Sequence, residues 1–482
     1  MRRARLIKPV LLIALSAVCL ISAGQQQGTL PSDRLQSVNV LVVQGGLLID
    51  GRGGAPVPDA VVVIQGSKVL SADRKGQVPI PPGATVIDAT GKTIIPGLVD
   101  SHVHLADSEL PHFLYWGVTT IGDTGNVPSW IRAQKEGVEK GAVVGPTILM
   151  VGSGVDQPPR KMGSDSHQPI TDERSMEAAI LLAKRSGADA IKIYSGISTA
   201  LIKYGVQIAH REGLPAFSHY SSQTAGRGTD DIIDTGLDMH VHTHGLEKAT
   251  VNKELREQII AGKFRNPHYL MDSSKFPALA QQMVDRKMSL NPTLDSFWVK
   301  VSKNRAEFDK INSTFWKGPM GTVLGDEEGR QLFARAYEPG TGDLAEMAQG
   351  YAKVGEFIRI FVGKGGRIVA GSDCGNARSP IAIRPPGTAL HVEMQMLQEV
   401  GLSPMQVLLS ATRWAMEAWH KQAEAGTIEP GKRADLVILN RNPLEDIAAT
   451  WDIDRVIKSG QIVDRGALVR WTNPLPLRPQ FD

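Results

Sequence analysis

The feature that most constrains the fold is a series of short apolar segments separated by stretches of helix length. Eight such segments occur, at 97–104, 118–123, 146–152, 188–194, 215–220, 237–242, 288–294 and 367–373. The spacers include stretches with helical periodicity, such as SMEAAILLAKRSG. Strands that alternate with helices form parallel sheets, and eight such units suit a closed barrel. The sequence therefore predicts an α/β fold with a (β/α)8 TIM barrel over residues 97–422.

Both flanks of this region are rich in turn residues and short apolar runs. Residues 39–96 contain runs such as AVVVIQGSKVL between Gly and Pro, and residues 423–475 repeat the style in GTIEPGKRADLVILNRNP. Such punctuation is typical of small antiparallel sheets. We expect the two segments to form one small β-sandwich domain, built from both ends of the chain.

Residues 1–24 have the anatomy of a signal peptide. A basic start is followed by an apolar run from Val10 to Ile21 and then by small residues. The run is shorter than the roughly 20 residues that span a membrane. An uncleaved N-terminal anchor is the alternative, and Cys19 adds the option of a lipoprotein. We expect a cleaved signal, and hence a periplasmic or secreted protein without a membrane anchor.

The net charge argues against nucleic acid as a partner. The chain carries a formal charge of +3, and residues 1–24 hold four basic residues and no acid, so subtracting them leaves −1. A body of this charge, without a basic aromatic stripe, offers no nucleic-acid surface. Once a signal is removed, Cys374 is the only thiol, which excludes an intramolecular disulfide.

Ionisable residues gather at the ends of the predicted strands. His102 and His104 end the first strand and are two residues apart, so their side chains point the same way. The other members are Lys192, His219, His242 and Asp373. Any one buried histidine can be a hydrogen-bonded core residue. Four histidines and an aspartate at strand ends instead predict a site for a divalent transition metal.

Lys192 permits two interpretations. Ile191 and Ile193 flank it, so its side chain points to the other face of an apolar strand, into the barrel. Burial lowers the pKa of an ammonium group. A neutral amine beside two metal ions can be carboxylated by carbon dioxide and bridge them. The simpler interpretation is a lysine paired with an acid such as Asp373, and spacing alone favours it.

The ordered motifs resemble the amidohydrolase superfamily. These are HVH after IIPGLVD, then KIY, SHY, HVHTH and AGSD, with IDATGKTIIPGLVDSHVHL and GTIEPGKRADLVIL at the flanks. The resemblance covers residues 39–465 and is greatest to the imidazolonepropionase-related branch, which includes dipeptidases. It implies two divalent metal ions, most often zinc, and a carboxylated Lys192. His102, His104 and Asp373 would hold the first ion, Lys192 would bridge, and His219 and His242 would hold the second.

The sequence departs from the branch at the sixth strand. Where the branch often has D-x-I-E-H-G, this chain has DMHVHTHG, with His240, His242 and His244 available. Counting from Asp238 selects His242, whereas aligning the His-Gly pair selects His244. All three have the same strand parity, so a neighbour could instead contact substrate. At the second strand, Asp123 is interpreted as structural or as support for a ligand.

The resemblance implies a metal-dependent hydrolase that cleaves a C–N bond, amide or peptide, of a small molecule such as a dipeptide. We expect attack by a metal-bound hydroxide, with Asp373 as general acid and base. A single-metal deaminase or cyclic amidase of the same superfamily is the alternative. An inactive metal-dependent scaffold or binding protein is a second one. A homo-oligomer is compatible with the sequence but not required by it.

Substrate contacts are expected just beyond the ligand positions, from Tyr194, Tyr220 and His244. Packing at the barrel rim is an equal alternative for the two tyrosines. The spacer between the seventh and eighth segments is unusually long and holds Phe297 and Trp298. Long loops at strand C-terminal ends carry sites in barrels. We therefore expect substrate specificity to depend chiefly on residues 295–345.

Overall fold

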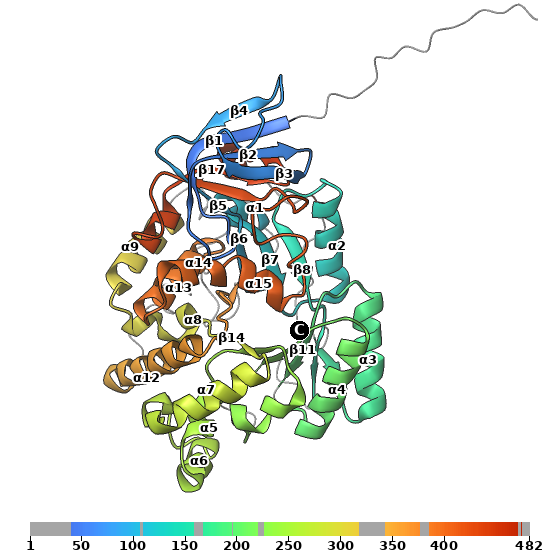
Figure 1. The fold of residues 1–482 in the computed structure, drawn as a ribbon. Coiled ribbons are helices and arrows are strands. Elements are labelled where there is room, and N and C mark those ends of the chain that lie inside the picture. Colours follow the sequence, from blue (N-terminus) through green and yellow to red (C-terminus); the bar gives the residue numbers. More distant parts are fainter. Residues whose placement is uncertain are drawn as a thin grey trace, which may run out of the picture. The chain divides into compact units, whose positions relative to one another are not determined.

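The computed structural model describes residues 40–106, 109–158, 167–194, 196–219, 226–317, 343–375 and 385–470, and residue 474. Residues 1–24, with the predicted signal, and Tyr220 lie outside the described residues. Asn39–Asp482 is one compact unit by its contacts. Its described part holds a ring of parallel strands with helices outside it and a separate terminal sheet (Figure 1).

The ring consists of two hydrogen-bonded sheets. One has the order β15-β6-β7-β8 and the other β10-β9-β11-β12-β13-β14. A hydrogen bond from Asp189 N to Met150 O, 2.7 Å, links β8 to the start of β11. The strands are β6 Leu98–His104, β7 Val118–Asp123, β8 Thr147–Met150, β9 Gly154–Asp156, β10 His167–Pro169, β11 Ile191–Tyr194, β12 Ala216–His219, β13 Met239–Val241, β14 Ser289–Asn291 and β15 Cys374–Gly375. Seven of the eight predicted segments thus contain a strand.

The prediction of a regular strand over 367–373 is wrong. The structure has an isolated bridge between Leu290 and Ile368 and a short strand β15 beyond the segment. The segment still closes the ring, because Val369 N donates to Leu290 O (2.8 Å) and Ser101 N donates to Ala370 O (3.1 Å). Gly371 lies so close to β6 that a Cβ there would be 2.7 Å from the His102 Cβ. This crowding prevents a regular ladder but keeps the segment beside the first strand.

Helices cover the outside of the ring and follow most of the strands. They are α1 Leu110–Tyr115, α2 Pro128–Glu139, α3 Glu173–Arg185, α4 Thr199–Arg211, α5 Leu246–Thr250, α6 Lys253–Ile260, α7 Phe276–Asp285, α8 Leu294–Trp298, α9 Arg305–Lys317, α12 Leu344–Gly363, α13 Thr388–Glu399, α14 Pro404–Ser410, α15 Arg413–Ala418 and α16 Arg465–Leu468. Local sequence sets their ends: Asp172 caps α3 by accepting from Ser175 N, and Lys184 and Arg185 lie in its last turn. Among the described helices, none is long and apolar enough to cross a membrane.

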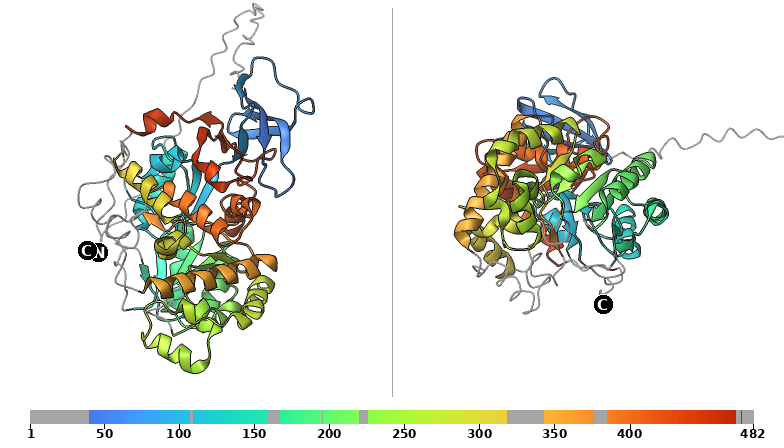
Figure 2. Two further views of the ribbon diagram at one scale, coloured as in Figure 1. Left: turned by 90° about the vertical axis from the view of Figure 1, so that its left-hand side faces the viewer. Right: turned by 90° about the horizontal axis from the view of Figure 1, so that it is seen from below.

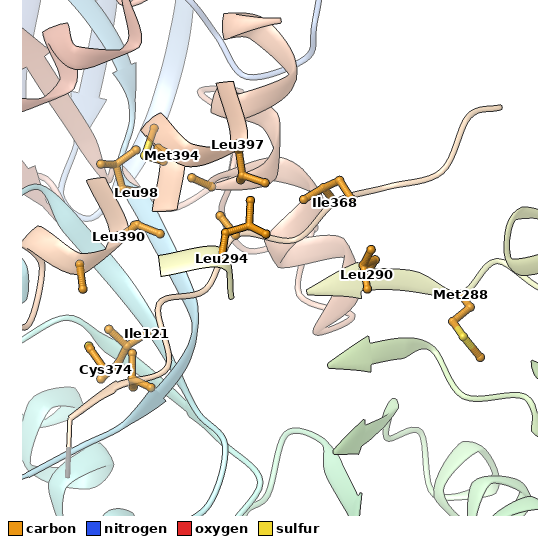
Figure 3. Packing of buried hydrophobic residues seen from close by; sticks show 14 of the residues in the cluster. Leu98, Ile121, Met288, Leu290, Leu294, Ile368, Cys374, Leu390, Met394 and Leu397 are labelled. Atoms are coloured by element: carbon orange, nitrogen blue, oxygen red, sulfur yellow. The ribbon is translucent and has the colours of Figure 1, made fainter. Parts of the chain in front are cut away.

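The core has two layers separated by the strands. Residues that face outward, such as Ile191 and Ile193, pack under the helices in the largest cluster. Figure 3 shows part of this cluster, where Leu290 and Ile368 approach α8 and α13. Residues that face inward form a second cluster, which includes Val99, Leu149, Ala190, Phe217, Met239, Val369 and Trp419. Lys192 follows Ala190 with the same parity and is fully buried, so its predicted position inside the barrel is confirmed.

The two flanks meet in one mixed sheet of eight strands, β18-β17-β16-β5-β1-β2-β3 with β4 beside β1. Figure 2 shows this sheet at one side of the barrel. Its strands are β1 Val40–Leu48, β2 Val57–Gln65, β3 Lys68–Arg74, β4 Thr85–Asp88, β5 Thr93–Pro96, β16 Leu436–Leu439, β17 Ile453–Lys458 and β18 Gln461–Ile462. The early and late segments join where β16 pairs with β5. Whether the sheet folds into a two-layer sandwich stays a prediction.

Buried polar contacts attach this sheet to the barrel. Asp435 accepts hydrogen bonds from Arg433 (2.6 Å) and Lys458 (3.2 Å). The same two cations reach the barrel, Arg433 at Thr120 (2.9 Å) and Lys458 at Thr147 (2.8 Å). Since Asp435 is buried, its two partners balance a charge that would otherwise be costly to bury.

Candidate metal centre

The C-terminal ends of the barrel strands bring five predicted residues into direct contact, with Lys192 among them. The members are His102, Lys192, His219, His242 and Asp373, joined by His104 at the rim. Ligand atoms of His102, His242 and Asp373 all lie within 4.8 Å of one another, a spacing that suits one metal ion. In a barrel, this end of the strands is where active sites are built.

His102 and His104 converge on one carboxylate oxygen. The Nε2 atom of each lies 3.3 Å from Asp373 Oδ1. Asp373 also accepts from the Ser296 hydroxyl at its other oxygen, 3.3 Å away. Burial alone would raise the pKa of Asp373, but the neighbouring imidazoles of His102 and His104 hold it well below its usual range. The centre therefore contains an ionised carboxylate facing two ring nitrogens.

The opposite nitrogens of three imidazoles contact acceptors. Nδ1 of His102 lies 2.9 Å from Asn291 Oδ1, and Nδ1 of His104 lies 3.1 Å from the Gly125 carbonyl oxygen. The Asn291 amide nitrogen donates to Val369 O, which identifies the oxygen that faces His102. Since these oxygens only accept, Nδ1 donates in both rings, and Nε2 is the nitrogen that faces Asp373.

His242 follows the same rule. Its Nδ1 lies 2.7 Å from the Thr293 hydroxyl, whose own proton is donated to Pro292 O at 2.8 Å. The Nδ1 atom must therefore donate, and the Nε2 lone pair faces His219 Nδ1 at 3.1 Å. Partners of this kind, which fix the tautomer and the orientation of the ring, are typical of histidines that bind metals.

Burial keeps the ligand imidazoles neutral. The pKa values of His102, His219 and His242 all lie well below the usual value, because burial disfavours the charged ring and neighbouring cationic groups add to the effect. Neutral rings and one carboxylate form the donor set that a zinc-like ion prefers.

Lys192 lies at the bottom of the centre. Its Nζ atom contacts the Thr124 hydroxyl at 3.0 Å and His102 Nε2 at 3.2 Å, and neither recorded partner is a carboxylate. Burial lowers its pKa to about 8, although Asp373 and Asp123 raise it. About one tenth of the amine is therefore neutral at pH 7, and this is the form that can react with carbon dioxide.

Backbone strain gathers at this end of the barrel. Positive φ angles occur at His242 (68°), Thr293 (48°) and Asp373 (52°), where side chains other than glycine are uncommon. Such strain persists only where the surrounding structure imposes it, and it is frequent at active sites.

The backbone conformation also helps to determine which of the three histidines of HVHTH reaches the centre. Strand β13 ends at Val241, so the common parity of the predicted strand does not continue through His242.

The three histidines of HVHTH have different surroundings. His240 is buried between the Ser218 hydroxyl (3.2 Å) and the His244 carbonyl oxygen (3.0 Å), a structural environment. His242 joins the centre, whereas the ring of His244 lies 6.5 Å from that of His242 in a neighbouring cavity. The structure thus places His242, rather than His244, beside the other candidate ligands.

The remaining sequence predictions fall near the centre. Tyr194 is buried with its ring 4.7 Å from that of His219, and burial raises the pKa of its hydroxyl. Asp123 Oδ2 accepts from Leu105 N and from Asn126 Nδ2, both at 2.9 Å, and Oδ1 accepts from Gly125 N. This carboxylate positions the Gly125 peptide whose oxygen orients His104. The predicted substrate contacts of Tyr194, Tyr220 and His244 stay predictions.

Sequence reasoning missed the residues that orient the ligands. Asn291 and Thr293 lie at the C-terminal end of the predicted seventh strand, where polar residues in an apolar segment were the available signal. Asp100, in the first predicted strand, was also missed. It is fully buried, burial raises its pKa to about 7, and it accepts from Ser372 Oγ at 2.6 Å. It thus fastens the 367–373 segment to β6, next to His102.

Comparison with known proteins agrees with this fold. The model of the amidohydrolase family matches residues 93–463. The chain belongs to the amidohydrolase family, and it is a hydrolase of carbon–nitrogen bonds.

A curated relative supports the predicted branch. The chain is 22% identical to an imidazolonepropionase of Symbiobacterium thermophilum over 473 residues, which cover 90% of this chain and 100% of the relative. The resemblance to the imidazolonepropionase-related branch is therefore confirmed.

Two solved structures support the TIM-barrel-like fold. One is a Xaa-Pro dipeptidase with methionine bound in its active site, with 18% identity, a TM-score of 0.62 and coverage of 88% of this chain and 100% of that one. The other is phenylurea hydrolase B, with 19% identity, a TM-score of 0.64 and coverage of 91% and 100%. Since these relatives act on unlike molecules, the fold does not identify the substrate.

Proposed function

We propose that the chain is an exported, metal-dependent amidohydrolase that cleaves an amide or peptide bond of a small substrate, such as a dipeptide. The observation that carries this proposal is the convergence of two ring nitrogens on one oxygen of a buried carboxylate. The Nε2 atoms of His102 and His104 both approach Asp373 Oδ1, and their other nitrogens already donate to the protein. Such a donor set suits a divalent cation.

In this proposal the centre holds two divalent ions, and the ions are zinc. His102, His104 and Asp373 would hold one ion, while His219 and His242, whose facing nitrogens lie 3.1 Å apart, would hold the other. Lys192 lies 3.2 Å from His102 Nε2 and would bridge the two after carboxylation of its amine. When bound, such ions lower the pKa of water and polarise a carbonyl oxygen.

Asp373 is the residue suited to move the proton. Its carboxylate is ionised and accepts from the Ser296 hydroxyl, so it is held in place with lone-pair capacity to spare. It would take the proton of the attacking water and return it to the leaving nitrogen, the role of general base and then general acid. Asp373 has a positive φ, and its carboxylate faces the Nε2 atoms of His102 and His104.

Export is proposed on the basic and apolar pattern of residues 1–24. The test is the mass of the mature chain recovered from a host that exports it. Loss of a segment of about 24 residues supports a cleaved signal, whereas an intact chain in the membrane fraction supports the anchor instead.

Metal analysis together with a substrate screen tests the main proposal. We expect about two zinc-like ions per purified chain, and hydrolysis of at least one class among dipeptides, N-acyl amino acids and ureas. Lys192→Ala should lose metal and activity together. The double variant Glu247→Gln with Lys248→Met is a matched control, since it removes an equally buried lysine together with its partner outside the centre. No stoichiometric metal, or full activity in Lys192→Ala, would contradict the proposal, and a single ion would favour the deaminase or cyclic-amidase alternative.

A further inference from the structure

A cavity of about 270 Å³ lies beside the metal centre, and no step of the hydrolysis uses it. Its walls include Phe297 and Trp298 from α8, Met347 from α12, and His244 after β13. We call this cavity the aromatic pocket. For scale, a dry cavity of roughly 150 Å³ suffices to bind benzene. The aromatic pocket is therefore large enough for a bulky side chain.

The pocket and the metal centre share a wall. The Phe297 ring lies 5.2 Å from the ring of His242 and 4.9 Å from that of His244, edge to face in both cases. Helix α8 also connects the two sites in sequence. Ser296 contacts Asp373, Phe297 forms the wall, and Trp298 lines the pocket. The aromatic pocket and the metal centre thus lie on two sides of the same aromatic ring.

The polar groups under the pocket do not form a second metal site, although His244, Glu247 and His268 have suitable spacing. His268 Nε2 already has two protein partners, the carbonyl oxygen of Thr243 at 3.2 Å and its hydroxyl at 3.3 Å. Glu247 accepts from Gly245 N at 2.7 Å and from Lys248 at 3.1 Å. Most of the donors and acceptors that a metal would need are already used.

Charged groups at the pocket are also engaged. Asp343 caps α12 by accepting from Ala345 N (2.8 Å) and Glu346 N (3.2 Å). Glu346 is hydrogen-bonded to Tyr269, whose pKa is raised mainly by burial and by this carboxylate. What the pocket offers to a ligand is therefore chiefly the faces and edges of two aromatic rings and a thioether, which favour an aromatic partner.

We propose that the aromatic pocket binds a bulky apolar side chain of the substrate, preferably an aromatic one. The substrate class is then an amide or dipeptide of a hydrophobic amino acid. This inference rests on the proposed function, because it assigns the pocket to the substrate of the metal centre. Met347 and Phe297 are specificity residues in this assignment, and they take no part in proton transfer.

The test measures binding of two product-like probes to the purified full chain with its metals. Calorimetry with the free amino acids L-phenylalanine and glycine should show a preference of at least about tenfold for phenylalanine. Met347→Trp fills the pocket and should remove most of this preference. Leu344→Trp is the matched control, since Leu344 is 41% exposed on the same helix and should leave the preference unchanged.

The outcomes separate this inference from the proposed function. Equal binding of both probes, or a preference that survives in Met347→Trp, overturns the pocket assignment even if the chain hydrolyses amides. If Met347→Trp unfolds early in thermal melting, Phe297→Ala replaces it and should alter the same preference by enlarging the pocket. A phenylalanyl preference without any amide hydrolysis would retain the pocket and overturn the hydrolase proposal.

Discussion

Two neighbouring clusters of histidine and carboxylate have opposite chemistry. In the metal centre, the Nε2 atoms of His102 and His104 both face one carboxylate oxygen of Asp373, and their Nδ1 atoms contact acceptors of the protein. In the cluster below the aromatic pocket, His268 Nε2 faces the Thr243 carbonyl oxygen and Glu247 is paired with Lys248. Both clusters are rich in ligand-type residues. The difference teaches that the orientation of the ring nitrogens, rather than composition, distinguishes a candidate metal site.

The strongest test of the metal centre is Asp373→Asn. The amide keeps the shape of the side chain but cannot accept a proton at neutral pH. We expect kcat to fall by about 10²–10⁴-fold, the range of a lost general acid–base group. Steady-state kinetics on the best amide from the screen checks this. Circular dichroism of the variant serves as the control for folding, and near-normal kcat would remove Asp373 from proton transfer.

Substitutions in the cluster that contains Glu247 and Lys248 should lower the stability of the protein rather than its catalytic activity. Burial alone would raise the pKa of Glu247, but the neighbouring His268 and Lys248 lower this pKa to about 2. Glu247→Gln leaves the Lys248 ammonium buried and unpaired, which costs about 3–5 kcal/mol. Urea unfolding measures this loss, and Glu247→Gln with Lys248→Met should recover much of it. Loss of a bound metal ion in the folded single variant would show that this cluster is a ligand site after all.

The orienting residues should give an intermediate effect. Asn291→Ala removes the acceptor that fixes the His102 tautomer but leaves every candidate ligand in place. Loss of such a partner costs about 10–100-fold in metal affinity or activity. Competition with a chromogenic zinc chelator measures the affinity. Asn266→Ala is the matched variant, since Asn266 contacts His268 in the same way at 3.3 Å, and it should leave metal affinity unchanged.

The smallest effect is expected at a histidine outside both clusters. The hydrogen bond to Asp238 (2.8 Å) raises the pKa of His210, so the folded state holds the proton more tightly than the unfolded one. The stabilisation is then fully present below the unfolded pKa, about 6.5, and disappears as the pH rises through the raised value. His210→Gln should lose at most about 1 kcal/mol at pH 5.5, since the side chain is partly exposed. A loss at pH 9 as large as at pH 5.5 would contradict this assignment.

Much of the barrel could be predicted because its signal is local. Seven of the eight predicted segments contain a strand, since buried parallel strands are short apolar runs whatever they pair with. The segment at 367–373 fails because its geometry depends on the crowding of Gly371 against His102, two residues far apart in sequence. Domain boundaries and the two-layer nature of the terminal sheet stay predictions.

The candidate site divides in the same way. Ligand types at strand ends are visible in the sequence, because position on a strand determines which end of the barrel a side chain reaches. The choice of His242 over His244 is not visible, since it depends on a strand that ends at Val241 and on a positive φ at His242. The roles of Asn291 and Thr293 in orienting the histidine rings were not predicted either, because these roles depend on contacts between separate strands.

The sequence by itself determined the alternation of strands and helices, the ligand types and the family motifs, all of which follow from the order of residues along the chain. Only the tertiary structure decided which ring nitrogens face the metal centre, and that a separate pocket opens behind Phe297. The physical reason is that an imidazole ring is oriented by the acceptor opposite it, and that acceptor comes from another strand. A cavity likewise belongs to the space between elements rather than to any one of them.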